Sequence, residues 1–503
     1  MEIVQVRRTL RFYNKVKTGC QTCKKRKVKC DEGKPYCNHC LRTGRRCEGY
    51  SSVPQAPSLP ITRDPDLHTR LFASSEERRS FFFFQNNASK SLGGVFNTSF
   101  WGREVMQAAI HYPLVRHLVI ALGSAYETFE SGTVIQDGSL ALQQRACAIN
   151  LLHNLMQRPD IASEETTGCI LTAVVLFIYL ACVRGRYAEA FQHIRSGVTL
   201  LQQLEDFTQE RKSVLRVGYP ISSSRLRYML SFTYGQFRGM VNDTFLETGS
   251  YDVLRTEVKP AVLFTSLGDA HSYIENLRNN ALSFLQSCEF RPNILTDELE
   301  STVGRHRQLC LALESSQNAL DSYVQGLSAH EHDTMQDGIS ILRVHQLLLA
   351  IRLHINVLKP EERESSYTIW EGHFEEILRQ CESAVQREQD RIDAGTFNSC
   401  SSGLGYVMPL HAVAARCRDP QLRHRAAELL LKAPMRDGLW DSRVIGRIVS
   451  KTIQLEEGSS GTMGSKVREV KLEALDDEKV TLQFITVDDW REGRRGQEMV
   501  VQL

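Results

Sequence analysis

The chain has 503 residues, enough for one small module together with one large domain or two medium ones. Apolar residues make up 42% of it and charged residues 24%, which permits a sizeable core and excludes a chain that is mostly disordered. The net charge of +2 is unevenly spread. Residues 1–50 carry 14 Lys and Arg against 4 Asp and Glu, whereas the rest carries 47 against 55. A basic end on a mildly acidic body is expected where that end meets a polyanion, although a solvated basic tail would have the same composition.

The first residues do not predict a secretory signal. Met1–Tyr13 mixes three arginines with short apolar pairs and has no continuous apolar run. The longest apolar stretch, Cys169–Cys182, is interrupted by Thr172 and is short for a bilayer, so we interpret it as a buried helix. We therefore expect an intracellular protein with reduced thiols and no membrane partner.

The cysteine spacing is the strongest local signal. Six of the 14 cysteines fall between residues 20 and 47, where about one would be expected at the average density of this chain. The pattern C-x2-C-x6-C occurs, and after six residues it occurs again. The six are Cys20, Cys23, Cys30, Cys37, Cys40 and Cys47.

This repeat predicts a metal centre with two zinc ions. A C-x2-C pair brings two thiolates to one ion, and zinc takes four such ligands in a tetrahedron. Two ions need eight ligand positions, which six thiolates fill only if two of them bridge. The repeat indicates Cys20 and Cys37, the first cysteine of each half, as the bridges. Three disulfides are the competing structure, which the reducing compartment and the basic surroundings disfavour.

The run CQTCKKRKVKCDEGKPYCNHCLRTGRRC resembles the Zn2Cys6 binuclear cluster of fungal transcription factors. The match covers all six ligands, the basic stretch after the second cysteine, the Lys-Cys-Asp of residues 29–31 and the Lys-Pro before Tyr36. Lys24 departs from the family, which often has Arg there, and the charge is kept. The resemblance implies a nuclear regulator of RNA polymerase II genes that binds CGG-type half-sites in double-stranded DNA. It also implies contact with the transcription machinery and a role in a metabolic or secondary-metabolite pathway, and it leaves a homodimer open.

The basic residues of the module are the predicted DNA contacts. Five of the six residues between Cys23 and Cys30 are basic, and on a short helix they would fan around the axis toward phosphates and the groove floor. The resemblance places base reading on Lys27, with Arg26 beside it. The second half would grip the phosphate backbone. The predicted contacts are Lys24, Lys25, Arg26, Lys27, Lys29, Arg42, Arg45 and Arg46.

Two alternatives concern the basic residues, and two further residues of the module are interpreted separately. The basic runs could be a nuclear-import signal or a solvated face, and import is compatible with DNA binding. The resemblance implies a tight, cis turn at Pro35, in the loop between the halves. His39 follows directly before Cys40, which makes joint coordination of one ion awkward, so we interpret it as a surface residue and not a ligand.

The remainder predicts a mostly α fold. A Ser- and Pro-rich linker is expected over 51–74, between a cluster module over 15–50 and an all-α body over 75–455. Apolar residues at helical spacing occur at 142–155, 187–201 and 341–358. Over 466–490, alternation at Val470, Leu472, Val480, Leu482 and Phe484 around an Asp-Asp turn predicts a β-hairpin, with an acidic activation segment as the alternative.

The body also resembles the fungal-specific transcription factor regulatory domain, more loosely than the cluster does. The residues that carry this resemblance are Phe81–Phe84, Phe100-Trp101, Pro113–His117, Ala121–Ser124, Arg184–Arg186, Ala190, His193 and Gly197. The eight cysteines outside the module form no C-x2-C pair, and we expect them to be buried thiols.

Function is weighed between three classes. A DNA-binding transcription regulator is favoured over a zinc-cluster-bearing α-helical enzyme and over a protein-interaction module. The sequence contains no HExxH, no phosphate-binding P-loop and no G-x-S-x-G, so no catalytic residue is assigned.

Overall fold

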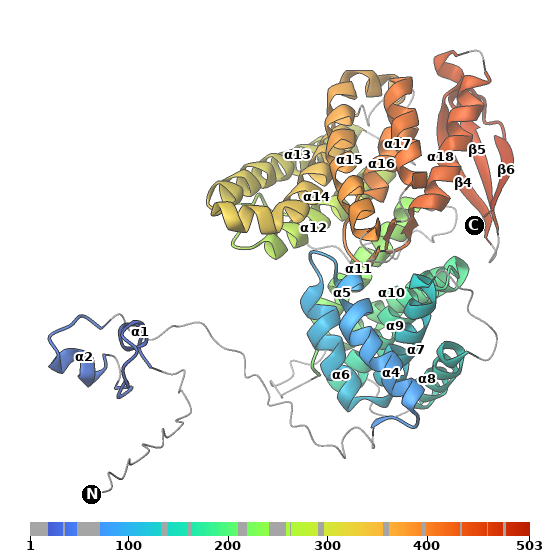
Figure 1. Cartoon of the computed structure of the whole chain (residues 1–503). Helices are drawn as coiled ribbons and strands as arrows, with labels where there is room; N and C mark the ends of the chain where they lie inside the picture. The colour runs from blue at the N-terminus through green and yellow to red at the C-terminus, as the bar shows by residue number, and fades with distance from the viewer. Residues whose placement is uncertain are drawn as a thin grey trace, which may run out of the picture. The chain divides into compact units, whose positions relative to one another are not determined.

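A computed structural model of the chain separates into two compact units, Met1–Leu67 and His68–Leu503 (Figure 1). Each is described by itself. The structure describes residues 19–33, 36–47, 71–131, 139–157, 163–209, 219–240, 258–261, 263–289, 296–355, 362–393, 399–432, 435–459, 461–475 and 479–502. The linker expected over 51–74 falls almost entirely outside these residues, as does Pro35.

The described residues of the first unit, 19–33 and 36–47, form two short helices, α1 (Gln21–Lys25) and α2 (Asn38–Arg42). Five of its cysteines are buried and form a cluster of their own, with Cys30 packed against it.

The second unit begins with a group of helices around one apolar core (Figure 1). Helix α9 is central to it, and nearly all of its described side chains are buried. The elements are α4 (Ser75–Phe83), the π-helical turn η1 (Phe84–Ala88), α5 (Ser89–Gly93), a second π-helical turn η2 (Phe100–Glu104), α6 (Val105–His111), α7 (Pro113–Glu130), α8 (Leu140–Met156), α9 (Glu164–Val183), α10 (Tyr187–Gln209) and α11 (Ser223–Met240).

One helix in the described part of the chain is long and apolar enough to cross a membrane by length and composition. This stretch, Glu165–Val183, has a mean hydropathy of 2.3, and 94% of its apolar window is buried inside the protein. Burial of this kind is typical of the core helix of a globular body, as we predicted for this stretch.

A second group of helices surrounds a second apolar core. Capping fixes where several of them begin, for example at Ser328, which forms a capping box with Glu331 at the start of α14. The elements are α12 (Leu267–Glu289), α13 (Thr296–Gln325), α14 (Ala329–His354), the 3-10 turn η5 (Ser365–Trp370), α15 (Glu371–Asp393), α16 (Val407–Arg416), α17 (Pro420–Lys432) and α18 (Ser442–Glu457).

A small sheet corrects the prediction of a purely helical body over 75–455. Strand β1 (Ser399–Ser401) pairs in parallel with β2 (Met435–Asp437), which pairs antiparallel with β3 (Trp440–Asp441). These strands join the two cores, because Cys400 belongs to the first core and Met435 to the second. Strands of two or three residues carry no readable alternation, which explains why the sequence did not predict them.

The C-terminal hairpin is confirmed and has a third strand. Strand β4 (Val467–Leu475) pairs antiparallel with β5 (Lys479–Thr486), with Val470 opposite Phe484 and Leu472 opposite Leu482. After the short helix α19 (Val487–Glu492), β6 (Gln497–Gln502) pairs antiparallel with β5. The sheet packs beside α18 (Figure 1). The fold is therefore mostly α, with a cysteine cluster at one end and a small antiparallel sheet at the other.

Two of the three helical patterns place the expected residues inside. In α10, Ala190, Ile194, Val198 and Leu201 are buried, and α14 covers most of 341–358. In α8 the helix is right but the buried face differs. Its buried residues are Ala141, Gln144 and Ala148, whereas Ile149 is 41% exposed.

Several of the residues on which the body's resemblance to the fungal-specific regulatory domain rests have roles in packing. Trp101 Nε1 donates a hydrogen bond to Ser402 Oγ at 2.7 Å, which ties the first helical group to the loop after β1. Gly185 has φ +71° in the turn between α9 and α10. At Gly197 a Cβ would lie 2.8 Å from Val174 Cγ1, so α10 approaches α9 closely there.

The remaining cysteines partly correct the expectation of buried thiols. Six are buried, Cys310 is half-buried and Cys147 is exposed on α8. The exposure of Cys147 follows from the rotated face of that helix.

Gly123 on α7 tests the packing of α4 against α7. A Cβ at this position would lie 2.1 Å from the backbone oxygen of Ser80, and backbone cannot rotate away. We expect Gly123→Ala to lower the free energy of unfolding by about 1–3 kcal/mol. Gly102→Ala is the control, because a Cβ there meets nothing within 4 Å, and it should leave stability unchanged or slightly higher. Urea unfolding of both variants measures the difference, and equal midpoints would contradict the close approach.

Candidate metal centre

The two halves of the cysteine module begin in the same way. Cys20 is the N-cap of α1, and its sulfur accepts a hydrogen bond from the Cys23 backbone N–H at 3.4 Å. Cys37 is the N-cap of α2, and its sulfur accepts from the Cys40 N–H at 3.3 Å. Donation from a backbone amide favours the thiolate form of each capping cysteine. The sequence repeat is thus a structural repeat.

The two helices also end in the same way. In the first half, Val28 N bonds to Cys23 O and Lys27 N bonds to Lys24 O, both at 3.1 Å. In the second half, Arg45 N bonds to Cys40 O at 3.0 Å and Gly44 N bonds to Leu41 O at 3.1 Å. This pair of bonds is a Schellman ending, which requires a left-handed residue just past the helix. Gly44 with φ +63° and Lys27 with φ +54° are those residues.

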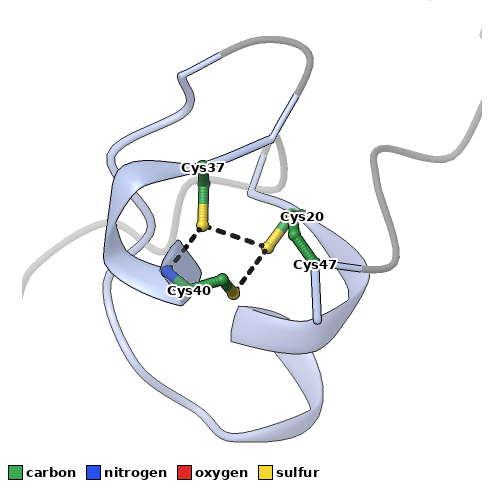
Figure 2. A group of neighbouring side chains, drawn as sticks. All are labelled: Cys20, Cys37, Cys40 and Cys47. Carbon is green, nitrogen blue, oxygen red and sulfur yellow. Dashed lines mark hydrogen bonds between the residues drawn. The ribbon is translucent and has the colours of Figure 1, made fainter. Parts of the chain in front are cut away.

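The six sulfurs form two groups of four that share two members. One group is Cys20, Cys23, Cys30 and Cys37, and the other is Cys20, Cys37, Cys40 and Cys47. Within each group the sulfurs lie within 4.8 Å of one another. Figure 2 shows the second group, in which the side chains point toward one another from both halves. Cys20 and Cys37 belong to both groups, which is the arrangement that bridging by these two cysteines requires.

The spacing of the sulfurs suits zinc. Four sulfurs at about 2.3 Å from one ion in a tetrahedron are about 3.8 Å apart. The Cys20 sulfur lies 3.6 Å from the Cys37 sulfur and 3.8 Å from the Cys40 sulfur (Figure 2). The Cys23 sulfur lies 3.7 Å from the Cys37 sulfur. The donor set and its geometry therefore fit a zinc-thiolate centre.

Because the cysteines are buried, their thiolate forms need a bound cation to be stable. Five of the cysteines are buried and Cys30 is half-buried. Burial raises the pKa of the Cys23 thiol to about 12, and it also raises the pKa of Cys20 and Cys37. A bound dication reverses this preference, because it stabilises the thiolate directly. The cysteines are also the whole buried cluster of the module's described residues, so little else holds it together.

The loop between the halves is fixed by Asp31. Burial would raise the pKa of its carboxyl, but hydrogen bonds from the backbone N–H groups of His39 and Asn38 outweigh this effect and lower the pKa. The carboxylate thereby caps the beginning of α2. His39 is half-buried and belongs to neither group of possible ligands.

The basic run does not follow one helix, which corrects the expectation of cations fanned around a helix axis. Helix α1 ends at Lys25, so Lys24 and Lys25 lie on it, Arg26 is its C-cap, and Lys27 and Lys29 follow its end. The chain has to turn there because the Cys30 sulfur must return to the cluster, where it accepts from Cys20 N at 3.4 Å.

The predicted DNA contacts differ in exposure. Arg26 is half-buried, and its Nη1 atom is buried without a hydrogen-bond partner. The other seven side chains are exposed. In the second half, Arg42 lies on α2, while Arg45 and Arg46 follow it. The Thr22 hydroxyl donates to Arg46 O at 3.3 Å, which connects the end of the module to α1.

Comparison with known proteins agrees with this geometry. The fungal Zn(2)-Cys(6) binuclear cluster domain matches residues 18–57. The N-terminal module is a fungal Zn2Cys6 cluster domain. The resemblance recognised from its residues is therefore confirmed, and the module is a zinc-binding one.

Relatives extend the similarity to the body. The chain is 24% identical over 558 aligned positions to the aspercryptin biosynthesis cluster-specific transcription regulator atnN of Emericella nidulans, with 88% of each chain covered. It is 28% identical to the transcription regulator lscL of Purpureocillium lilacinum, over 35% of this chain and 47% of that protein. It is 46% identical to the transcriptional regulatory protein moc3 of Schizosaccharomyces pombe over about a tenth of each chain. No solved structure matches this chain.

Metal removal should unfold the module and leave the body intact. The two helices have five residues each, and among the module's described residues only the cysteines form a buried cluster, so we expect both helices to depend on metal binding. Addition of a chelator to the full chain should abolish protection from hydrogen exchange over residues 19–47. Peptides from α7 and α9 serve as the internal control and should stay protected. Unchanged protection of the module after the zinc has been removed would contradict this dependence.

Proposed function

We propose that this chain regulates transcription by binding double-stranded DNA through its Zn2Cys6 module and reading CGG-type triplets in the major groove. The chain is a DNA-binding transcription regulator, and the observation that carries this conclusion is the six-sulfur cluster with its two overlapping sets of ligands. Named transcription regulators among its relatives support the same function. The relatives that we report are not named as enzymes, and we propose no catalytic activity for this chain.

We propose that the module binds two zinc ions. Two tetrahedral ions need eight positions, and six thiolates supply eight if Cys20 and Cys37 bridge. These two are also the cysteines that receive a backbone N–H at a helix N-cap, which moderates the charge on a sulfur between two ions. Two Zn²⁺ and six thiolates sum to −2, and the exposed lysines and arginines around them offset this charge.

Native mass spectrometry of the full chain should find two zincs per chain. Cys20→Ser removes a ligand from both groups and should weaken the binding of both ions. Cys147→Ser is the matched control, because Cys147 is an exposed cysteine of the body. It should retain two zincs. A wild-type chain that holds one zinc, or one whose six cysteines form three disulfides, would rule out the bridged cluster.

Lys27 is proposed as the base-reading residue. It is exposed, it follows directly after the end of α1, and it occupies a left-handed conformation that costs an L-residue roughly 1–2 kcal/mol. The second half places Gly44, the residue suited to that conformation, at the equivalent position. A side chain kept at a position that favours glycine supports a role for that side chain beyond folding. A lysine in the major groove donates to guanine O6 and N7.

Replacing Lys27 by glycine separates its side chain from its backbone conformation. Lys27→Gly suits the left-handed turn, so the module should hold its zinc at least as well as the wild type. Its affinity for a CGG-containing duplex should fall by roughly 1–3 kcal/mol, while its affinity for a scrambled duplex changes less. Lys27→Ala should lose as much preference for the CGG-containing duplex. Unlike glycine, alanine still pays the energetic cost of the left-handed conformation at residue 27. The measurement is a titration of both duplexes at two salt concentrations.

Arg46→Ala provides the contrast for a phosphate contact. Arg46 is exposed at the other end of the module and is proposed to bind the DNA backbone. Its removal should weaken binding to all sequences by a similar factor and flatten the salt dependence by about one unit. If Lys27→Gly instead lowers both affinities equally and leaves their ratio unchanged, Lys27 is a phosphate contact, and Arg26 becomes the candidate for base reading.

Further parts of the proposal concern the cell. We propose that the protein acts in the nucleus, that the remaining contacts, Lys24, Lys25, Lys29, Arg42 and Arg45, hold phosphates, and that the body contacts the transcription machinery. The relative with 88% coverage is named as specific to a biosynthesis cluster, which supports a metabolic or secondary-metabolite pathway as the target. Binding as a homodimer stays a prediction.

A further inference from the structure

A cavity of about 280 Å³ lies where the C-terminal sheet meets the helical body. Its walls come from α10, α16 and α18, from the loop before η5, from β3 and from strands β4 and β5. A dry apolar cavity of about 150 Å³ is already large enough to bind benzene. The space beside the sheet therefore suits a ring with a short side chain.

Most of the lining is apolar. Phe191 of α10 and Leu482 of β5 are among the lining residues. Val444 and Ile448 of α18 line the cavity from the helix and Leu472 of β4 from the sheet, and each of these three is only half-buried. An apolar surface that neighbouring side chains leave incompletely covered is stabilised when an apolar molecule covers it.

The charged side chains of the lining already interact within the protein. Asp441 accepts from Arg436 and caps the beginning of α18. Arg416 donates to Glu364 Oε1 at 3.1 Å and to the Arg468 backbone oxygen at 2.9 Å. The other charged residues of the lining are Arg363, Arg468 and Glu469, and they interact with Glu364, the Trp490 ring and Lys471 in turn. Because these groups have partners, a ligand does not have to supply a counterion.

Two neutral polar groups of the lining lack a hydrogen-bond partner among the residues that the structure describes. Trp440 is 3% exposed, and its Nε1–H is one of these groups. The other is the buried Nδ1 of His411, whose ring centroid lies 5.4 Å from that of Trp440. Burial lowers the pKa of His411 to about 3, so its ring is neutral. A buried donor without an acceptor is unfavourable unless a ligand or water supplies one.

Water alone fits this cavity poorly. One water takes up about 30 Å³ of liquid volume, so a single water at Trp440 would leave most of the 280 Å³ empty. Each further water would need about two to four polar partners, and the apolar side chains of α18 and β4 offer none. A mainly apolar molecule with one acceptor would satisfy both parts of the lining.

We propose that this cavity binds a small neutral molecule that consists of an apolar ring and one carbonyl group. The carbonyl oxygen would accept from Trp440 Nε1, and the ring would cover the apolar surface between α18 and β4. A carboxylate would suit the site less well, because it would have to displace the present partners of the arginines to recover its lost hydration. The inference concerns the body alone and does not depend on how the module binds DNA.

Three matched probes test the chemical class by calorimetric titration of the full chain. The ketone 4-phenylbutan-2-one has a ring and a carbonyl, 3-phenylpropionate has a charged oxygen in place of the terminal methyl, and propylbenzene lacks the acceptor. The ketone should bind saturably at one site per chain, and the acid should bind at least about tenfold more weakly because its charge loses hydration. Absence of saturable ketone binding at about 1 mM, or an acid that binds as tightly as the ketone, would overturn the proposal.

Replacing Trp440 by phenylalanine tests the hydrogen bond. Trp440→Phe keeps an apolar ring and removes the N–H, so it should weaken ketone binding about fivefold and leave propylbenzene binding unchanged. Trp370→Phe is the matched control, because it removes another buried indole N–H from a side chain outside the lining, and it should bind both probes as the wild type does. An equal loss of both probes in Trp440→Phe would contradict the hydrogen bond.

Filling variants locate the site. Val444→Phe on α18 and Ala415→Leu on α16 each place additional atoms in the cavity, and both should abolish ketone binding. Two such variants are needed because either substitution alone could unfold the body, which circular dichroism would detect. Leu311→Phe enlarges an exposed side chain on α13 and should bind the ketone as the wild type does. Full ketone binding by both filling variants would place the ligand elsewhere and refute this site.

Discussion

The N-terminal module is held together by sulfur and metal where larger domains use an apolar core. Within the described residues its buried cluster consists of cysteines, and the two helices attached to them have five residues each. Helices of that length are not stable alone in water. Their direction, their ends and the positions of the lysines therefore follow from where the sulfurs must lie. Cys20 and Cys37 belong to both groups of sulfurs, so the bridging that we propose would prevent the two halves from moving independently.

This constraint explains the unusual backbone at Lys27. Six residues separate Cys23, on helix α1, from Cys30. Within them the chain must end the helix and bring the Cys30 sulfur back to the cluster. A Schellman ending supplies the required reversal in both halves, with Gly44 in one and Lys27 in the other. Metal binding by Cys23 and Cys30, the proposed ligands on either side, would offset the cost of the left-handed lysine. The lysine side chain is then carried on a fixed backbone at the end of a helix, which would limit the entropy lost in the contact with a base that we propose.

The sequence predicted the sulfur groups because covalent spacing alone decides them. Spacing also predicted the hairpin, where Val470 pairs with Phe484 and Leu472 with Leu482. It failed where tertiary packing decides. Strand β6 was missed because Val501 is its one buried residue, so no alternation is visible. The face of α8 was misplaced because small residues at 141 and 148 pack inside while Ile149 stays exposed. The end of α1 was missed because a lysine rarely adopts a left-handed conformation.

The cavity between the C-terminal sheet and the helices was beyond sequence reasoning for a related reason, since Tyr187 and Phe191 line it together with strands β4 and β5, more than 200 residues later. Two buried carboxylates set those walls. Glu364 binds Arg416 and Arg418, and Glu456 binds Arg423 at 2.5 Å and accepts from Val467 N at 2.8 Å. Buried ion pairs add little net stability, but removing one partner costs about 3–5 kcal/mol, so they strongly disfavour other arrangements. Both carboxylates act at the start of β4, Glu364 through Arg416 and Glu456 directly, which fixes the sheet against α16 and α18.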